Sequence, residues 1–182
     1  GDPLTTAILG GAFAPPHLGH VALAEGALRE LGADRLLVLV NSNPGHKPTV
    51  LDAEARLALA CAAFGGLPNT DVRLDHHAYT VDLLRDEQFD DAVFVLGGDE
   101  WAAFDTWKDP DEIKRLIPLA VASRPGELEP EGDVTVFPIE QQSISSRDIR
   151  ARIARGEPVD DLVPPGVARE IERRGLYSGT AS

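Results

Sequence analysis

Short apolar runs alternate with amphipathic segments from one end of the chain to the other. Runs such as 35–40 and 92–96 are apolar almost throughout, which is typical of parallel strands covered on both faces. The segments between them carry apolar residues at helical spacing, and several end at glycine or proline. The pattern predicts strands at 4–9, 35–40, 72–74, 92–96, 119–122 and 134–137, and helices at 17–31, 52–64, 79–89, 109–118, 147–154 and 165–174.

Strands and helices that alternate in this way predict an α/β fold, a doubly wound parallel sheet of the Rossmann-like kind with right-handed crossovers. Ligands of such sheets bind beyond the carboxyl ends of the strands, where the strand order reverses. The chain has 182 residues, and no repeat, low-complexity tract or linker interrupts it. We therefore expect a single domain spanning residues 1–182.

Composition narrows the classes of function. Thirty acidic residues against seventeen basic ones give a net charge of −13, which repels nucleic acids and anionic membranes. No apolar run reaches the roughly 20 residues that cross a bilayer and no signal-peptide pattern is present, so we expect a cytoplasmic protein. The only cysteine, Cys61, excludes a disulfide framework, and its apolar neighbours predict that it is buried. The sequence leaves open whether the chain forms a homo-oligomer.

The segment after the first predicted strand reads Gly10-Gly-Ala-Phe-Ala-Pro-Pro-His17-Leu-Gly-His20. Two glycines at a strand end let the backbone approach a ligand closely, because no Cβ stands in the way. His17 and His20 lie three residues apart at a predicted helix start, where free N–H groups and the helix dipole attract phosphate. Two imidazoles there can donate hydrogen bonds to phosphoryl oxygens. The alternative is that one histidine caps the helix and the other packs in the core; no third ligand stands nearby, which disfavours a metal site.

This segment resembles the signature of the nucleotidyltransferase superfamily that carries a His-x-Gly-His motif, and within it the nicotinate-nucleotide adenylyltransferases. The resemblance implies a Rossmann-like nucleotidyltransferase fold. It also implies transfer of the adenylyl group of ATP to nicotinic acid mononucleotide, with release of pyrophosphate and with Mg²⁺ entering on ATP. The order and spacing of further matching segments carry it along nearly the whole chain: 43–47, 78–82, 97–99 with Phe104 and Trp107, 124–126, 144–150 and 174–177.

By this resemblance one group of residues contacts ATP. His17 and His20 would stabilise the transition state, while Lys47 and Arg150 would neutralise phosphate charge. Ser145 and Ser146 start the helix that grips the phosphates in the family, although helix capping explains these serines equally well. The ATP-binding residues implied are Gly10, Gly11, Phe13, His17, His20, Gly97, Asp99, Arg124, Ile144, Ser145, Ser146 and Arg150.

A second group would bind the mononucleotide. Trp107 would stack on the pyridine ring, because a flat aromatic face suits a cationic pyridinium. Backbone N–H groups near Tyr79, Thr80 and Lys108 would meet the nicotinate carboxylate. Phe104 fits the core as well as the wall of a pocket. The residues implied are Lys47, Tyr79, Thr80, Phe104, Trp107 and Lys108.

Three positions depart from the family pattern. Ala12 and Ala14 replace hydrogen-bonding residues, and Arg147 stands where the family usually has threonine. These departures keep two alternatives open: a divergent paralogue that adenylylates nicotinamide mononucleotide or another phosphate such as phosphopantetheine, and a nucleotide-binding module with impaired catalysis. A nicotinamide-dependent oxidoreductase is disfavoured, because the Gly-x-Gly-x-x-Gly fingerprint and the acid that follows it are absent.

Overall fold

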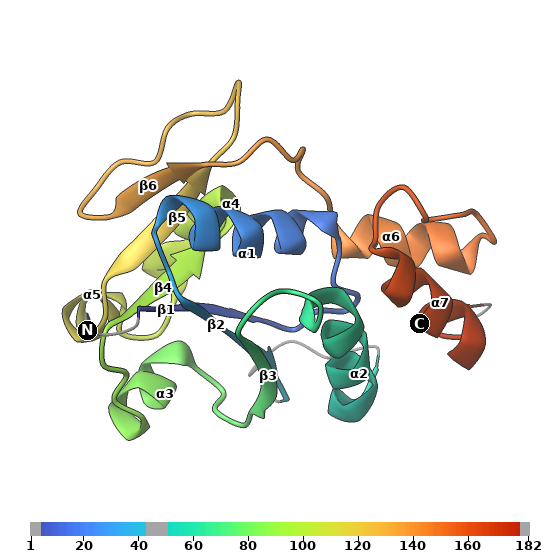
Figure 1. Ribbon diagram of the computed structural model, residues 1–182, viewed down its shortest axis with the longest axis horizontal. Helices are drawn as coiled ribbons and strands as arrows, with labels where there is room; N and C mark the ends of the chain where they lie inside the picture. The colour runs from blue at the N-terminus through green and yellow to red at the C-terminus, as the bar shows by residue number, and fades with distance from the viewer. Residues whose placement is uncertain (1–4, 43–50, 179–182) are drawn as a thin grey trace.

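In a computed structural model of the protein, which describes residues 5–42 and 51–178, six parallel strands form one sheet with helices on both faces (Figure 1). The strands are β1 Thr6–Gly11, β2 Arg35–Asn41, β3 Thr70–Asp75, β4 Ala92–Leu96, β5 Leu119–Ser123 and β6 Thr135–Pro138. The helices are α1 Leu18–Glu30, α2 Ala53–Phe64, α3 Thr80–Asp86, α4 Gly98–Ala102, the 3₁₀ turn η1 Phe104–Thr106, α5 Pro110–Leu116, α6 Ser146–Ala154 and α7 Pro165–Arg174.

The order of the strands across the sheet is β3-β2-β1-β4-β5-β6, and each pair of neighbours is parallel. The chain builds outward from β1 to β3, returns to the other side of β1 for β4, and continues outward to β6. The strand order therefore reverses between β1 and β4, which is where such sheets bind ligands. The predicted doubly wound parallel sheet is confirmed.

Each face of the sheet buries its own set of apolar side chains, as the two-residue period of a strand requires. In β1, Ala7 and Leu9 pack with residues of α1 and α2 in one cluster. Ile8, which lies between them, packs in a second cluster with residues of α3, η1 and α5. The two faces are thus covered by different helices, and the glycines that end β1 emerge between these two layers.

The C-terminal helices α6 and α7 form a third apolar cluster with α2 at one edge of the molecule, on the right in Figure 1. Ile149 of α6 and Val167 of α7 are fully buried in it, against Leu59 of α2. This packing places the start of α6, at Ser145 and Ser146, beside the loop that follows β1. The helix predicted to contact phosphate is therefore held next to the histidine segment.

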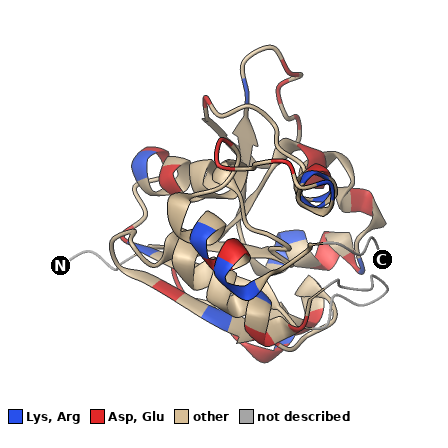
Figure 2. Cartoon of the chain, turned by 90° about the vertical axis from the view of Figure 1, so that its right-hand side faces the viewer, with Lys and Arg blue, Asp and Glu red and all other residues tan. Residues whose placement is uncertain are grey.

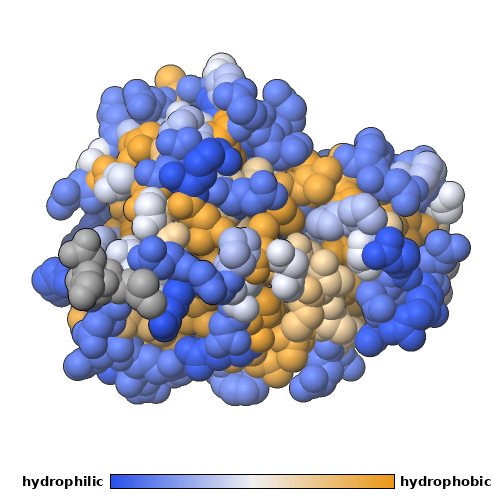
Figure 3. Space-filling model, viewed as in Figure 1, coloured by the Kyte–Doolittle hydropathy of each residue, from blue (hydrophilic) through white to orange (hydrophobic). Residues whose placement is uncertain are grey.

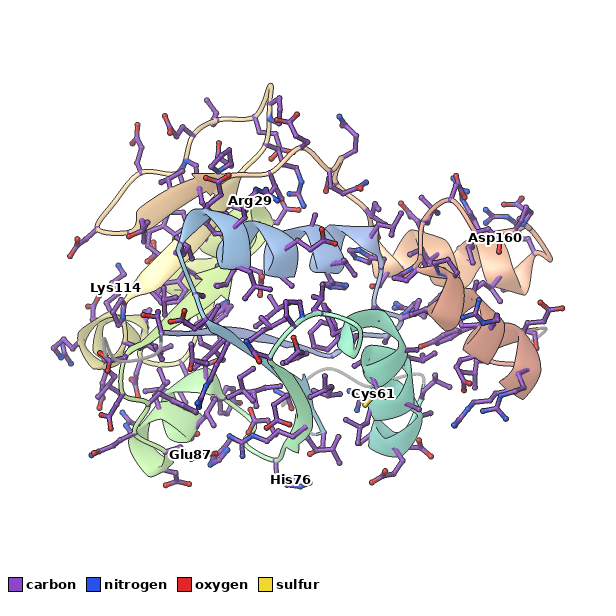
Figure 4. All side chains as sticks on the ribbon, in the orientation of Figure 1. Arg29, Cys61, His76, Glu87, Lys114 and Asp160 are labelled. Atoms are coloured by element: carbon purple, nitrogen blue, oxygen red, sulfur yellow. The ribbon has the colours of Figure 1, made fainter. Side chains whose placement is uncertain are left out.

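One local prediction is wrong, and two short elements were not predicted. Cys61 is exposed, because the buried face of α2 carries Arg56, Leu59, Ala60 and Phe64, and Cys61 faces away from it (Figure 4). The short helix α4 and the turn η1 were not predicted, because they have only five and three residues and their glycine and charged residues give no apolar residues at helical spacing. The connection between β5 and β6 contains no helix and projects as a loop at the top of Figure 1.

Charged residues of both signs are interspersed on the side of the molecule seen in Figure 2. In the view of Figure 3, hydrophilic residues cover the periphery while hydrophobic ones show through over the middle. Over the described ranges 5–42 and 51–178, the helices are too short or too polar for any of them to cross a membrane.

Candidate active site

The two histidines of the glycine–histidine segment are held by the first turn of their own helix. His17 is the N-cap of α1, and its Nδ1 accepts a hydrogen bond from the backbone N–H of Gly19 at 3.0 Å. His20 Nδ1 accepts from the backbone N–H of His17 at 3.1 Å. A backbone N–H can only donate, so both Nδ1 atoms are unprotonated and both rings carry their proton on Nε2. The pair therefore presents two neutral N–H donors.

The surroundings of the pair keep both rings neutral. Their planes stack with centroids 3.8 Å apart, and the edge of the buried Phe13 ring meets His20 at 5.0 Å. Burial, reinforced by the charge of Arg124, lowers the pKa of His17 to about 4. Burial, and then the neighbouring His17, lowers the pKa of His20 well below its usual value. At neutral pH the pair acts through dipoles and hydrogen bonds and carries no positive charge.

Positive charge at this end of the sheet comes from two arginines. Arg124 follows β5, and its Nε donates to the carbonyl of Gln141 at 2.9 Å. Arg150 of α6 donates from Nη1 to the carbonyl of Ala14 at 2.7 Å. Both side chains therefore anchor loops with one nitrogen, and each guanidinium has further N–H groups for a ligand.

The two serines at the start of α6 have different partners. Ser145 is the N-cap, and its Oγ accepts from the backbone N–H of Asp148 at 3.3 Å. Ser146 Oγ donates to the carbonyl of Pro15 at 2.9 Å, which ties α6 to the loop after β1. Ile144, just before them, packs against the third apolar cluster. Capping thus accounts for Ser145, and loop anchoring accounts for Ser146.

A fully buried arginine that the sequence reading missed holds this region together. Arg56 of α2 donates from Nη1 to the carbonyls of Ala12 at 3.0 Å and Asn41 at 2.6 Å, and from Nε to that of Leu51 at 3.2 Å. These carbonyls belong to the loop after β1, the end of β2 and the residue before the cap of α2. One guanidinium therefore joins three segments that border the site.

A cavity of about 440 Å³ opens beside the histidine segment, at the point where the strand order reverses. Gly10 and Gly11 form its floor at the end of β1, and Phe94 of β4 and Leu39 of β2 line the same wall. An added Cβ on Gly11 would lie 3.3 Å from the Phe13 ring, so a larger residue would require this buried ring to shift by a few tenths of an ångström. Its other lining residues are Ala12, Asn41, Asp75, Ala78, Tyr79, Thr80, Leu83, Glu100, Ala103, Thr106, Trp107, Lys108 and Ile113.

Most residues predicted to bind the mononucleotide meet in this cavity. Tyr79, Thr80, Trp107 and Lys108 line it. Phe104 is buried and does not line it; its ring packs behind Trp107, with centroids 5.0 Å apart, and so supports the tryptophan. Lys108 Nζ lies 3.2 Å from Asp82 Oδ2 and 5.0 Å from the centre of the Tyr79 ring.

The remaining predicted residues are placed as follows. Gly97 is the N-cap of α4, and Asp99 lies exposed in the first turn of that helix. Lys47 lies outside the described residues. Among the residues that the structure describes, no three His, Cys, Asp or Glu side chains lie close enough to hold a metal ion.

A second, larger cavity of about 690 Å³ lies at the opposite end of the strands. Its lining includes Glu25, Arg29, Arg35 and Asn69. Arg35 begins β2 and Asn69 precedes β3, so this cavity faces the amino ends of the strands. Parallel α/β sheets bind their ligands at the carboxyl ends. The smaller cavity, which lies at the carboxyl ends of the strands and is lined by Gly10 and Gly11, is therefore the candidate site.

The fold and the site together are those of an α/β nucleotide-binding enzyme, with imidazole and guanidinium N–H donors next to a cavity at the carboxyl ends of the strands. Comparison with known families makes the assignment more specific. Residues 8–152 match the model of the cytidylyltransferase-like family, and the chain belongs to this family of nucleotidyltransferases. The predicted resemblance to His-x-Gly-His nucleotidyltransferases is thereby confirmed.

Individual relatives point in the same direction. The chain is 36% identical to a probable nicotinate-nucleotide adenylyltransferase from Bordetella avium, over 93% of this chain and 96% of that protein. It is 35% identical to one from Thermus thermophilus, over 93% and 97%. Among solved structures, a putative nicotinate-nucleotide adenylyltransferase from Vibrio parahaemolyticus has a TM-score of 0.68 at 25% identity, covering 98% of this chain and all of that one. A Plasmodium falciparum nicotinic acid mononucleotide adenylyltransferase in complex with NaAD has a TM-score of 0.77 at 16% identity, over 96% and 98%, and supports the fold.

Proposed function

We propose that the protein transfers the adenylyl group of ATP to nicotinic acid mononucleotide, giving deamido-NAD and pyrophosphate. The observation that carries the proposal is a cavity lined by Gly10 and Gly11, the first residues of the glycine–histidine segment. Neither histidine lines this cavity, but both imidazoles follow these glycines in the same segment, and their Nε2–H groups are free of partners among the described residues. The relatives from Bordetella avium and Thermus thermophilus are named as probable adenylyltransferases for this acceptor, which supports the choice of reaction. ATP and mononucleotides are cytosolic metabolites, and we expect the enzyme to act there.

In this reaction an oxygen of the mononucleotide phosphate attacks the α-phosphorus of ATP. A new P–O bond forms, the bond from the α-phosphorus to the oxygen that bridges to the β-phosphorus breaks, and pyrophosphate leaves with that electron pair. No covalent intermediate with the protein is needed. Catalysis then consists of holding the two phosphates in line and stabilising the charge that builds up on their oxygens.

The histidine pair suits the second task. His17 and His20 are oriented by the N–H groups of their own helix turn, so their Nε2–H donors need no reorganisation during the reaction. Neutral imidazoles donate hydrogen bonds without repelling the cations that accompany ATP. Arg124 and Arg150 supply the positive charge for the phosphate oxygens. The part of the site proposed for ATP also includes Asp99, in the first turn of α4, and the first residues of α6.

The acceptor occupies the cavity in this proposal. Trp107, backed by Phe104, offers a flat face to the pyridinium ring. Tyr79 and Thr80, at the start of α3, and Lys108 border the same space and offer backbone N–H groups to the substituent on the ring. Gly10 and Gly11 lie between the ring and the histidines, so the mononucleotide phosphate would pass over them.

Mg²⁺ is expected to arrive on the triphosphate. The described residues include no cluster of three His, Cys, Asp or Glu side chains that would hold a divalent ion by itself, so phosphate and water oxygens would supply most of its ligands. When bound, the ion neutralises charge on the phosphates of ATP and of the leaving pyrophosphate.

The proposal is tested by following pyrophosphate release from Mg-ATP with nicotinic acid mononucleotide, nicotinamide mononucleotide and phosphopantetheine in turn. We expect turnover with the first, and a loss of at least 100-fold in kcat for His17→Ala. His76→Ala is the matched control, because His76 directly follows β3, is exposed and does not line the cavity (Figure 4). Release that is absent with every acceptor would favour a binding module, and turnover unchanged in His17→Ala would refute the mechanism.

A further inference from the structure

One acidic residue that lines the cavity takes no part in the proposed phosphate chemistry. Glu100 is the third residue of α4, shortly after β4, and it is one of the residues that line the cavity, together with Trp107 and Gly10. Its Oε1 accepts the backbone N–H of Gly97 at 3.0 Å. Its second oxygen, Oε2, has no hydrogen-bond partner among the described residues, so only one of the two carboxyl oxygens is held by the protein.

The charges around Glu100 do not compensate it. Of the other charged side chains that line the cavity, Asp75 of β3 is bonded to His77, with Oδ1 2.7 Å from Nδ1, and Lys108 is paired with Asp82. No lysine or arginine of the described residues lies within ion-pair distance of Glu100. The other titratable neighbours are Tyr79, in the cavity wall, and Asp99, on the same helix.

Although Glu100 as a residue is only partly buried, its carboxyl group is desolvated enough to titrate near neutral pH. Desolvation raises its pKa to about 7, the hydrogen bond from Gly97 opposes that rise, and the charge of Asp99 adds to it. Near pH 7 the protonated and ionised forms are therefore both populated. The cavity accordingly has two electrostatic states that differ by one negative charge.

These two states suit different ligands. A protonated Glu100 can donate its O–H to a carboxylate on a pyridinium ring, a strong type of hydrogen bond. An ionised Glu100 repels the carboxylate of a nicotinate ring. It accepts an N–H from the amide of a nicotinamide ring, and it attracts that ring because the pyridinium charge there is not balanced by a carboxylate. A cavity of about 440 Å³ is only about 9–10 Å across, so any ring stacked on Trp107 feels this charge.

Resting on the proposed function, we propose that Glu100 sets the selectivity between acid and amide: its protonated form favours nicotinic acid mononucleotide, and its ionised form favours nicotinamide mononucleotide. Glu100 is thus a specificity-determining residue whose preference depends on pH. The amide acceptor that the sequence left open becomes the better substrate at alkaline pH.

The test is the ratio of kcat/KM for the two mononucleotides between pH 6 and pH 9. The titrations of ATP, of the histidines and of the acceptor phosphate are common to both substrates and cancel in this ratio. In the unmodified protein we expect the acid-to-amide ratio to fall by up to tenfold for each pH unit above 7. In Glu100→Gln, whose amide nitrogen can still donate to the carboxylate, the ratio should stay high and independent of pH.

The control variant is Asp105→Asn, which removes a neighbouring exposed acid that does not line the cavity; its ratio should follow the unmodified protein. A ratio that keeps its pH dependence in Glu100→Gln overturns the inference while leaving the proposed function intact. The absence of turnover with both mononucleotides overturns the proposed function and this inference with it.

Calorimetry of the unmodified protein gives a second measurement that needs no variant to fold. Binding is measured at pH 7 in two buffers of different ionisation enthalpy, once with each mononucleotide. Nicotinic acid mononucleotide should be bound with proton uptake by the protein, and nicotinamide mononucleotide with proton release. The same proton exchange for both ligands would overturn the role of Glu100.

Discussion

His17 links the stability of the fold to pH. Burial and the charge of Arg124 lower its pKa from 6.5 to about 4. The unfolded chain binds a proton at this imidazole near pH 6.5, so between pH 6.5 and about 4 the unfolded state holds more protons than the folded state. The contribution of His17 is complete above pH 6.5 and is lost as the pH falls to about 4. One pKa unit corresponds to about 1.4 kcal/mol, so the loss is about 3 kcal/mol.

The variant His17→Asn isolates the pH-dependent contribution of His17 to the free energy of unfolding. An asparagine oxygen can still accept the N–H of Gly19 as an N-cap, but it does not titrate. We expect the free energy of unfolding in urea to fall between pH 7 and pH 4 by about 3 kcal/mol more in the unmodified protein than in the variant. An equal fall in both proteins would refute the assignment of a buried, neutral His17.

His77 provides a control, because its contribution to stability should depend on pH in the opposite direction from that of His17. Its hydrogen bonds to Asp75 and then Asp86 raise its pKa above 6.5. The stability that it contributes is therefore fully present below pH 6.5 and is lost as the pH rises through the raised value. His77→Asn should destabilise the protein more at pH 6 than at pH 9, and the reverse order would contradict this geometry.

Three further perturbations test the site. Gly19→Ala should lower kcat about 100-fold in the turnover assay, because the new Cβ would lie 2.8 Å from His17 Cε1 and displace that ring. Gly66→Ala is the control: its Cβ would meet nothing within 4 Å, so kcat should not change. Trp107→Ala should raise KM for the mononucleotide about tenfold or more and leave KM for ATP unchanged, as measured in steady-state kinetics. Arg56→Lys should lower the free energy of unfolding by about 3 kcal/mol in urea, because a lysine cannot reproduce three hydrogen bonds from one planar group; unchanged stability would refute this role.

The fold could be predicted because its signal is repeated along the chain. Apolar runs that are covered on both faces specify parallel strands, and the glycines that end β1 mark the site end of the sheet. The prediction failed for Cys61 because α2 is apolar nearly all round, so composition does not reveal which side faces the core. The charged residue within that helix was the better signal: Arg56 lies at helical spacing from Leu59 and Ala60, on the buried face.

In the candidate site, too, some residues could be predicted from the sequence and others could not. The bonds that orient His17 and His20 are made within one helix turn, so the motif itself determines them. Glu100 lacks such a local signature. It follows Gly-Gly-Asp in a segment that sequence pattern does not assign to a helix, and it enters the cavity only because β4 lies beside β1 in the sheet. Its role depends on tertiary structure and could not be derived from spacing along the chain.

The two halves of the site differ in charge, and this difference bears on how the acceptor would be oriented. Arg124 and Arg150 stand on the side of the histidine pair, whereas Glu100 lines the cavity without a counter-ion among the described residues. A pyridine mononucleotide is itself dipolar, with a negative phosphate at one end and a positive ring at the other. The reversed orientation would place phosphate beside a carboxyl group and the pyridinium beside two guanidinium groups, which costs energy at both ends. A protein with a net charge of −13 can therefore bind an anionic substrate in one direction, because a few fixed charges near the ligand outweigh a distant, screened surface charge.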